Sequence, residues 1–402
     1  MLIVQAVDNM IKISNSGMNR YMGCGASYKF HYIDKYRSRV KSSALLFGSA
    51  IDVACNYMLE NFSQRDNDQY FNTAIEIFHN NWTESLDKDT GEYLELRKNP
   101  LIKYFKSDFD SEVLNLGDRQ ELGIDSPEKL KVHIEFRKQL EAKLKENKND
   151  WTSIDINERV LYNEVTWFSL LRKGELMLLA YHNEILPKLK SILTLQRPVQ
   201  IQDEEGNVLN GIVEFVAELQ DGRIALIDNK TSGSEYAEDS VENSQQLALY
   251  KQILNIQAAS PDYEWKTPIE YAGYAVMNKS IKKEVVKICK NCATVATSTH
   301  KTCNNVIDGT RCGGEWEVTT YLSSSTQFIV DKISDKFGES VLDNASAIVK
   351  SIQNNIFPKN FNKCRDDYGA PCQFIGMCHK GDKTNLIKLE EKEDKNGKKT
   401  AK

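Results

Sequence analysis

The chain has 402 residues, of which 27% are charged and 41% hydrophobic, and its formal net charge is −5. This length predicts two or three compact units. The acidic balance excludes a uniformly basic coat for nucleic acid but allows a local basic channel. No run of about 18 apolar residues occurs, so we expect no membrane span. The N-terminus has no basic leader or cleavage site, and we expect a mature cytoplasmic protein.

Hydrophobic periodicity in the first half of the chain predicts helices. An early helix within 14–62 has one apolar face, made of Ile51, Ala54, Cys55, Met58 and Leu59. A charged amphipathic helix begins after Ser126 and Pro127, which together form a cap signal. A second long helical region spans 165–193, and we expect an interruption near Lys173 and Gly174. Residues 63–195 are therefore predicted to be a helical insert or cover.

From residue 196 the pattern changes to that of a sheet. Strand, turn and strand are predicted over 198–219, then a strand over 222–231, a helix over 240–256 and a strand over 269–279. This order indicates an α/β core. The predicted segments are an N-terminal helical part (1–62), the helical insert (63–195), the core (196–284), a cysteine-bearing insert (285–320), C-terminal helices with further cysteines (321–385, helical over 321–356) and a disordered tail (386–402).

Two acids and a lysine fall on neighbouring predicted strands. Asp228 and Lys230 are two residues apart, so they point to the same face of a strand, and an adjacent antiparallel strand would bring Glu214 alongside. Converging carboxylates suit a hard divalent cation such as Mg²⁺ or Mn²⁺. A lysine beside that ion can orient a water or help to deprotonate it. The alternative is a surface salt bridge on a hairpin, because a D-x-K pattern is common.

Other residues favour a site over a salt bridge. Gln246 and Tyr250 are four residues apart and share one face of the helix that follows. Upstream, Asp52 lies on a helix behind Gly48. The alternative for Asp52 is an acid on a solvated helix face.

Together these motifs resemble the PD-(D/E)XK nucleases of the RecB-like branch, which includes the RecB and AddB nuclease domains and CRISPR-associated exonucleases. The resemblance rests on G-x-x-E from Gly211 to Glu214, I-D-N-K-T from Ile227 to Thr231, and Q-x-x-x-Y from Gln246 to Tyr250. It covers about 14–60, 196–280 and 355–380. It implies a restriction-endonuclease-like core with a mixed central sheet flanked by helices, into which the helical and cysteine-bearing segments are inserted.

The resemblance also implies roles for single residues. Asp228 and Glu214 would bind the metal, Lys230 would be the catalytic lysine, and Gln246 and Tyr250 would contact DNA or brace the site. This branch more often has Asp at the position of Glu214. Asp52 stands where the family often has a metal-binding histidine, and an aspartate can also bind Mg²⁺ or Mn²⁺.

Nine cysteines, an odd and clustered set, favour metal binding over disulfides. Cys289, Cys292, Cys303 and Cys312 lie in one short insert, where four thiolates suit tetrahedral Zn²⁺ in a zinc-ribbon-like site. The Gly-Gly pair after the last cysteine permits a tight turn, and the metal would supply the folding energy of a segment without its own core. His300 is an alternative ligand to one cysteine, and unrelated free thiols are the other interpretation.

A second set joins the two ends of the chain. It consists of Cys364, Cys372 and Cys378, with Cys24 as the distant fourth member. In iron–sulfur members of the same nuclease branch, one cysteine precedes the core and three follow it, and the resemblance therefore implies a [4Fe–4S] cluster. The final C-x5-C spacing matches that pattern, whereas seven residues separate the first pair. Zn²⁺ is the alternative, and Cys55 is expected in the core.

We therefore expect a metal-dependent DNA nuclease, an exonuclease acting in recombination, replication or DNA processing. Its expected partners are single-stranded DNA or duplex ends, held by the aromatic and basic residues of 28–39, and a recombination or replication protein. One alternative is a non-catalytic DNA-binding or assembly protein with a relict nuclease core. Another is a zinc-dependent adaptor that acts through 285–320. No P-loop is present, so ATP-driven unwinding by this chain is not expected.

Overall fold

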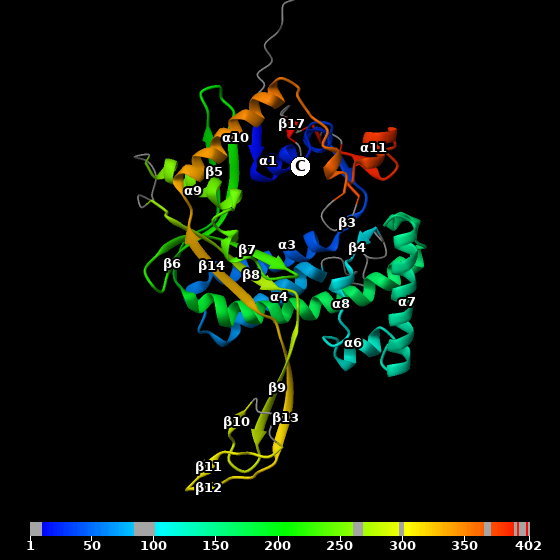
Figure 1. The fold of residues 1–402 in the computed structure, drawn as a ribbon, viewed down its shortest axis with the longest axis vertical. Coiled ribbons are helices and arrows are strands. Elements are labelled where there is room, and N and C mark those ends of the chain that lie inside the picture. Colours follow the sequence, from blue (N-terminus) through cyan, green and yellow to red (C-terminus); the bar gives the residue numbers. More distant parts are fainter. Residues whose placement is uncertain are drawn as a thin grey trace, which may run out of the picture.

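The computed structural model describes residues 10–83, 101–259, 268–296, 301–365, 371–389, 392–393 and 399–400. The fold is mixed α/β, with helices on both faces of a six-stranded mixed sheet and a β-arm that projects from the body (Figure 1). The predicted α/β class with a mixed central sheet is confirmed. No helix in the described part of the chain is both long and apolar enough to span a membrane.

The central sheet has the strand order β1-β6-β7-β8-β14, and β5 also pairs with β6. β7 runs antiparallel to β6 and parallel to β8, while β14 runs antiparallel to β8. A parallel pair requires a crossover connection, and helix α9 (Gln245–Ala258) lies in the one between β7 and β8. The strands are β1 (Lys12–Ser14), β5 (Leu189–Gln202), β6 (Val208–Leu219), β7 (Ile224–Ser232), β8 (Tyr271–Asn278) and β14 (Thr326–Lys332).

Successive residues of β7 belong to two different hydrophobic clusters. Leu226 packs in the cluster that contains side chains of α1, α9 and α10, and Ile227 packs in the cluster that contains side chains of α3, α4 and α8. This alternation is the period of a strand covered on both faces. Asp228 and Lys230 follow where the apolar run ends. The helices are α1 (Asn15–Gly23), α3 (Ser43–Glu60), α4 (Asp68–Thr83), α8 (Ile156–Ala180) and α10 (Asp335–Gln353).

The helical segment before the sheet is partly as predicted. Helix α7 (Pro127–Glu146) begins at its Ser126 cap, and a shorter helix, α6 (Leu116–Glu121), precedes it. The expected interruption at Lys173 and Gly174 is wrong, because α8 runs through both residues without a break. A Cβ atom on Gly174 would lie 2.1 Å from Phe78 Cζ, so this glycine allows α4 to pack closely on α8. The helical region also ends earlier than predicted, since β5 begins at Leu189.

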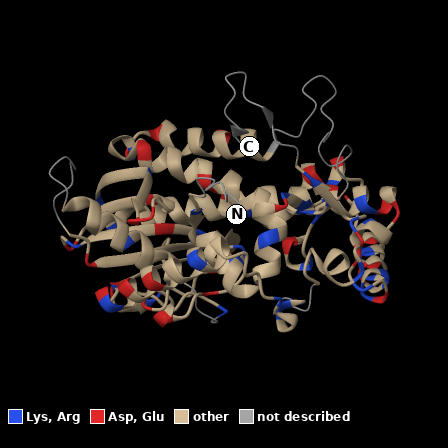
Figure 2. Cartoon of the chain, turned by 90° about the horizontal axis from the view of Figure 1, so that it is seen from above, with Lys and Arg blue, Asp and Glu red and all other residues tan. Residues whose placement is uncertain are grey.

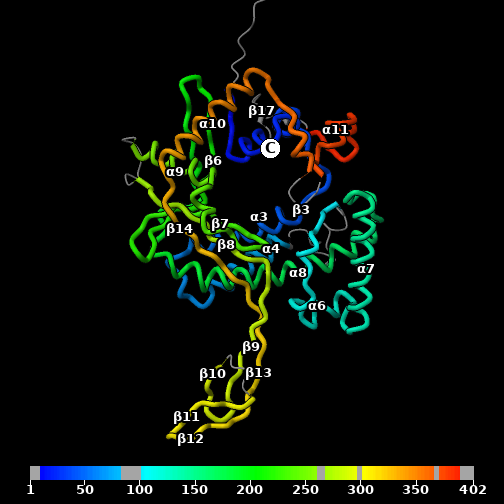
Figure 3. The backbone as a smooth tube through the Cα atoms, in the orientation of Figure 1, coloured from blue at the N-terminus to red at the C-terminus, as the bar shows by residue number. Residues whose placement is uncertain are grey.

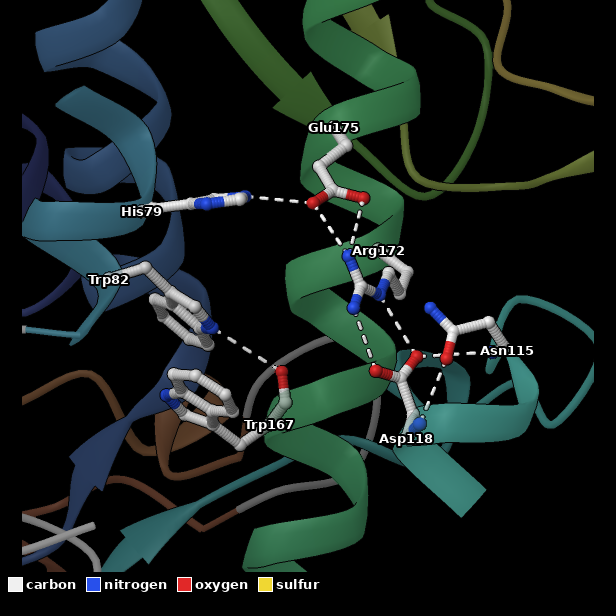
Figure 4. Close-up of polar contacts among 7 residues, drawn as sticks. All are labelled: His79, Trp82, Asn115, Asp118, Trp167, Arg172 and Glu175. Carbon is white, nitrogen blue, oxygen red and sulfur yellow. Dashed lines mark hydrogen bonds and ion pairs between the residues drawn. The ribbon is translucent and has the colours of Figure 1, made fainter. Parts of the chain in front are cut away.

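A polar cluster joins helices of this segment to one another (Figure 4). Arg172 on α8 donates to both Asp118 oxygens, at 2.7 and 2.9 Å, and also to Glu175 at 2.8 Å. His79 on α4 contacts the same Glu175 at 2.8 Å. The buried Trp82 belongs to the same hydrophobic cluster as the α3 and α8 side chains. Residues of the predicted helical insert therefore share one core with the sheet.

A long hairpin leaves the sheet between β8 and β14, and the smooth tube shows it as an arm away from the body (Figure 3). The arm consists of β9 (Lys282–Cys289), β10 (Val295–Ala296), β11 (Val306–Ile307), β12 (Thr310–Arg311) and β13 (Trp316–Ser323). The helix predicted over 321–356 is correct only for α10. Residues 321–332 instead complete β13 and form β14. The β-branched residues around Ile329 favour a strand there, and β14 pairs with β8.

The two ends of the chain meet. β15 (Leu386–Lys388) pairs antiparallel with β2 (Tyr36–Ser38), and Leu386 is buried. Residues 386–388 were predicted to begin a disordered tail. This prediction is wrong, because they pair with β2 and the Leu386 side chain is buried. Further on, β16 (Lys392–Glu393) pairs with β17 (Lys399–Thr400), and the other residues after 389 lie outside the described part of the chain.

Candidate active site and metal centres

The predicted acid–acid–lysine group comes together at the end of the β6–β7 ladder. Phe215 pairs with Ile227, so Glu214 and Asp228 are the next residues along the two strands. Asp228 is only 5% exposed, and its Oδ2 forms an ion pair with Lys230 Nζ. Glu214 Oε2 accepts a hydrogen bond of 2.7 Å from the backbone N–H of Asn229. The strand periodicity thus places all three charged groups in one small region.

Helix α9 braces this group from one face of the sheet. Gln246 Nε2 donates to Asp228 Oδ1 at 3.0 Å. Tyr250, one turn later, lies over Gly211, where a Cβ atom would be only 2.3 Å from the ring atom Cε1. The glycine of the G-x-x-E motif therefore leaves the space that the tyrosine of the Q-x-x-x-Y motif fills. Gln246 was predicted to contact DNA or to brace the site, and its hydrogen bond to Asp228 is a contact of the bracing kind.

Tyr274 is a residue near the site that the sequence analysis missed. It lies on β8 directly beside Asp228 in the parallel register, and its hydroxyl is 2.5 Å from Ser244 Oγ at the start of α9. Burial raises the pKa of its hydroxyl above the ordinary value. The sequence does not predict that Tyr274 lies beside Asp228, because the register between β7 and β8 cannot be read from either strand alone.

Asp52 reaches the site from the opposite face, on helix α3. Its Oδ2 accepts a hydrogen bond of 3.2 Å from Asn56. The carboxyl group also approaches Glu214 closely enough to contribute to the raised pKa of Glu214. One turn earlier, a Cβ atom on Gly48 would lie 3.6 Å from Thr231 Oγ1, so the helix passes close to the end of β7.

Burial dominates the electrostatics of the site. Burial and the nearby Asp228 hold the pKa of Glu214 well above its usual range. Burial also raises the pKa of Asp228, against the opposing effect of Lys230. For Lys230 burial alone would lower the pKa, but the Asp228 carboxylate outweighs it, and the pKa is raised. The site therefore places the charged ammonium of Lys230 beside two carboxyl groups, those of Glu214 and Asp228, whose pKa values are raised.

The oxygen donors present suit a hard divalent cation. Glu214 Oε1 is buried without a donor from a neutral or basic group, and the carboxyl groups of Asp52 and Asp228 lie close to Glu214. Buried carboxyl groups this close are costly when ionised unless a cation binds them. Asp228 and Asp52 supply further carboxylate oxygens of the type that Mg²⁺ and Mn²⁺ prefer. The three acids are more loosely grouped than the arm cysteines: in the described part of the chain, those cysteines alone bring three or more candidate ligand atoms within 4.8 Å of one another.

Replacement of Glu214 by Gln should stabilise the metal-free protein. The raised pKa means that folded Glu214 keeps its proton to a higher pH than the unfolded chain does, so stability falls as pH rises through the folded pKa. The variant lacks this loss. We expect a Tm gain of about 2 °C, equivalent to about 1 kcal/mol, at alkaline pH and none at acid pH. Thermal melts in a chelator across this pH range measure it, and an equal Tm difference at all pH values would contradict it.

The four cysteines of the arm form a compact set. Cys289 and Cys312 have their sulfur atoms 3.6 Å apart, as do Cys292 and Cys303. All four ligand atoms lie within 4.8 Å of one another, so the site can bind a metal ion. Gly314 leaves room for Cys289, since a Cβ atom there would lie 2.7 Å from its Sγ. His300, the alternative ligand, lies outside the described residues.

The arm thiols differ in their readiness to ionise. A hydrogen bond with Thr294 lowers the pKa of Cys292 to about 6. Burial raises the pKa of Cys303 to about 12. Four thiolates together therefore require a bound cation, and metal binding should release protons.

Removal of the metal should unfold the tip of the arm. Among the described residues of the tip, few side chains other than Cys289 and Cys303 are buried, so a bound metal would be its main source of folding energy. We expect Cys303→Ser, or treatment with a zinc chelator, to expose 285–320 to protease while the melting of the body is unchanged. Limited proteolysis with mass spectrometry measures this. Equal protection of the arm with and without metal would contradict it, and DNA cleavage by the variant shows whether the arm is an accessory.

The second cysteine set lines one cavity at the meeting point of the chain ends. Cys24, Cys364, Cys372 and Cys378 all contribute to its wall, together with the buried Phe374. Cys24 Sγ accepts a hydrogen bond of 3.5 Å from the backbone N–H of Asn360, which fixes it against the C-terminal segment. Their sulfur atoms are more widely spaced than those of the arm, and a four-iron cluster requires wider spacing than one zinc ion.

His379 was missed by the sequence analysis. Its Nε2 lies 3.6 Å from Cys364 Sγ, so it is a further candidate ligand at this cavity. The adjacent Cys378–His379 pair in the sequence was the available signal. A histidine beside Cys364 keeps Zn²⁺ open as the alternative metal, because zinc accepts mixed cysteine and histidine sets.

The aromatic and basic segment expected to hold DNA is partly built into the fold. Tyr28 is buried, and Lys29 forms an ion pair of 2.8 Å with Asp34. Burial and the nearby Arg20 and Arg37 lower the pKa of His31 to about 4. Elsewhere, lysine and arginine positions are interspersed with acidic positions along the ribbon (Figure 2).

Comparison with protein-family models gives no match, and no curated protein matches the chain. Function is therefore inferred from the side chains that the fold brings together. Those side chains are the acid and lysine group on the sheet and the two cysteine sets.

Proposed function

We propose that this protein is a metal-dependent DNA nuclease of the PD-(D/E)XK superfamily, in its RecB-like branch, with a restriction-endonuclease-like core. The observation that carries the proposal is the buried Asp228, held by Gln246 on one oxygen and by Lys230 on the other, beside Glu214. A surface salt bridge, the alternative weighed from the sequence, does not account for a buried acid with two partners. We propose exonuclease action on DNA in recombination, replication or DNA processing.

The chain's own residues have separable roles in this proposal. Asp228 and Glu214, with Asp52, would hold one or two divalent cations, which lower the pKa of water and screen the charge of the phosphate. Lys230, whose ammonium pairs with Asp228, would orient the nucleophile and stabilise negative charge. Gln246 fixes the direction of the Asp228 carboxylate. Tyr250, packed on Gly211, keeps α9 at a constant distance from the sheet.

The same proposal includes two further metal centres. The arm cysteines would hold Zn²⁺ and keep the tip of the arm folded. The cysteines at the chain ends would hold a [4Fe–4S] cluster that closes the domain. DNA is the proposed partner, with a recombination or replication protein as a second, and the proposed location is the cytoplasm.

A metal titration with DNA tests the proposed activity. Purified protein is incubated with linear duplex and single-stranded DNA, each labelled at either end, in Mg²⁺, Mn²⁺, Ca²⁺ or chelator. We expect degradation in Mg²⁺ or Mn²⁺ and none in chelator, with the two labels reporting the direction of digestion. Binding without cleavage under every metal would overturn the nuclease proposal and support the alternative of a DNA-binding or assembly protein.

A further inference from the structure

Strand β5 has an unusual backbone conformation opposite the site. Gln196 has a φ angle of 46°, and within the described strands it is the one residue other than glycine with positive φ. Its neighbours' ladder partners place it directly opposite Glu214. A side-chain-bearing residue is rarely found in this left-handed region, and such residues persist where the surrounding structure requires them.

The side chain of Gln196 begins a chain of hydrogen bonds that leads to Asp52. Gln196 Nε2 donates to Asn56 Oδ1 at 3.1 Å. Asn56 Nδ2 in turn donates to Asp52 Oδ2 at 3.2 Å. Asn56 and Asp52 are four residues apart on α3 and therefore face the same side of the helix. The left-handed turn at Gln196 thus connects the strand opposite Glu214 to the helix that carries the third acid.

We infer that Gln196 and Asn56 are positioning residues that hold the Asp52 carboxylate for a divalent cation. The inference rests on the proposed function, because it takes Asp52 as a metal-binding acid. Asn56 engages Oδ2, and the Asp52 carboxyl group also lies close to Glu214, so the two acids can share one ion. Gln196 occupies the Asn56 carbonyl and so fixes which end of the amide donates to Asp52. Partners of this kind orient metal ligands and contribute to metal affinity.

Mn²⁺ binding, measured by calorimetry on the whole protein without DNA, tests this inference. Asn56→Leu removes both hydrogen bonds at nearly constant volume, and we expect it to weaken Mn²⁺ binding about 10-fold. Gln196→Gly keeps the left-handed backbone but removes the amide, so we expect a smaller loss, about threefold. The double variant should bind no more weakly than Asn56→Leu, because Gln196 acts through Asn56.

Gln200→Ala is the matched control, since Gln200 is an exposed glutamine on the same strand. It should bind Mn²⁺ as the wild type does. Unchanged Mn²⁺ affinity in Asn56→Leu and Gln196→Gly would overturn the inference, as would a fall in Tm without a fall in affinity. A wild type that binds Mn²⁺ through Asp52 but degrades no DNA would overturn only the proposed function. A wild type that binds no Mn²⁺ would overturn both.

Discussion

Asp228→Ala and Lys230→Ala should each abolish metal-dependent DNA degradation while the protein stays folded. Asp228 is the acid that the site holds most firmly, with Gln246 and Lys230 as its partners. Loss of outer partners of a metal ligand typically costs 10–100-fold, so loss of the ligand itself should cost more than about 100-fold. Lys230→Ala removes the ammonium group that pairs with Asp228 and that, in the proposed function, would orient the nucleophile. Release of acid-soluble nucleotides in Mn²⁺ measures both effects.

The two variants should separate in their metal dependence. Asp228→Ala should weaken Mn²⁺ binding, whereas Lys230→Ala should leave it intact or strengthen it, because the competing ammonium is gone. Asp221→Asn is a matched control: Asp221 forms an exposed ion pair of 2.7 Å with Arg223 at the other end of β7. It should retain full activity. Undiminished degradation by both Asp228→Ala and Lys230→Ala would rule out this group as the active site.

The sequence predicted the acid and lysine group because strand and helix periods are local properties. Asp228 and Lys230 had to share a face, and the hairpin between β6 and β7 is short enough to bring Glu214 to them. Gln246 and Tyr250 had to share a helix face for the same reason. The contact between Gly211 and Tyr250 explains why two separate motifs belong together, although neither motif shows it alone.

Features that depend on contacts distant in the sequence were not predicted. Gly174 has the signature of a helix break, but its partner Phe78 lies on another helix and makes the glycine a packing residue. The tail was expected to be disordered by composition, yet Leu386 pairs with a strand near the N-terminus. Gln196 lies between the predicted helical region and the first predicted strand, and only the backbone shows its positive φ. In each case tertiary contacts decided against the local preference.

Cys24→Ser should detach the two ends of the chain from each other and destabilise the whole domain. The four cysteines line one cavity, whose wall is formed by Cys24, residues of α2 (Gly25–Tyr28) and the segment that carries α11 (Ile375–Lys380). A metal centre there closes a loop of most of the chain, and a covalent link over such a loop stabilises by on the order of 5 kcal/mol. We expect anaerobically purified wild type to be brown and to contain iron, and the variant to lack the colour and unfold at lower urea.

Cys55→Ala distinguishes the loss of the metal centre from the loss of a buried thiol. Cys55 is fully buried on α3, 3.8 Å from Met277 Sδ, and belongs to neither cysteine set. This variant should keep the visible absorbance and the iron content even if its stability falls. A colourless wild type with zinc at this cavity would exclude the cluster, and His379→Ala would then be expected to lower zinc content, because its ring lies beside Cys364. Iron in the wild type with no effect of His379→Ala supports four cysteine ligands, so these variants and a metal analysis decide between the two metals.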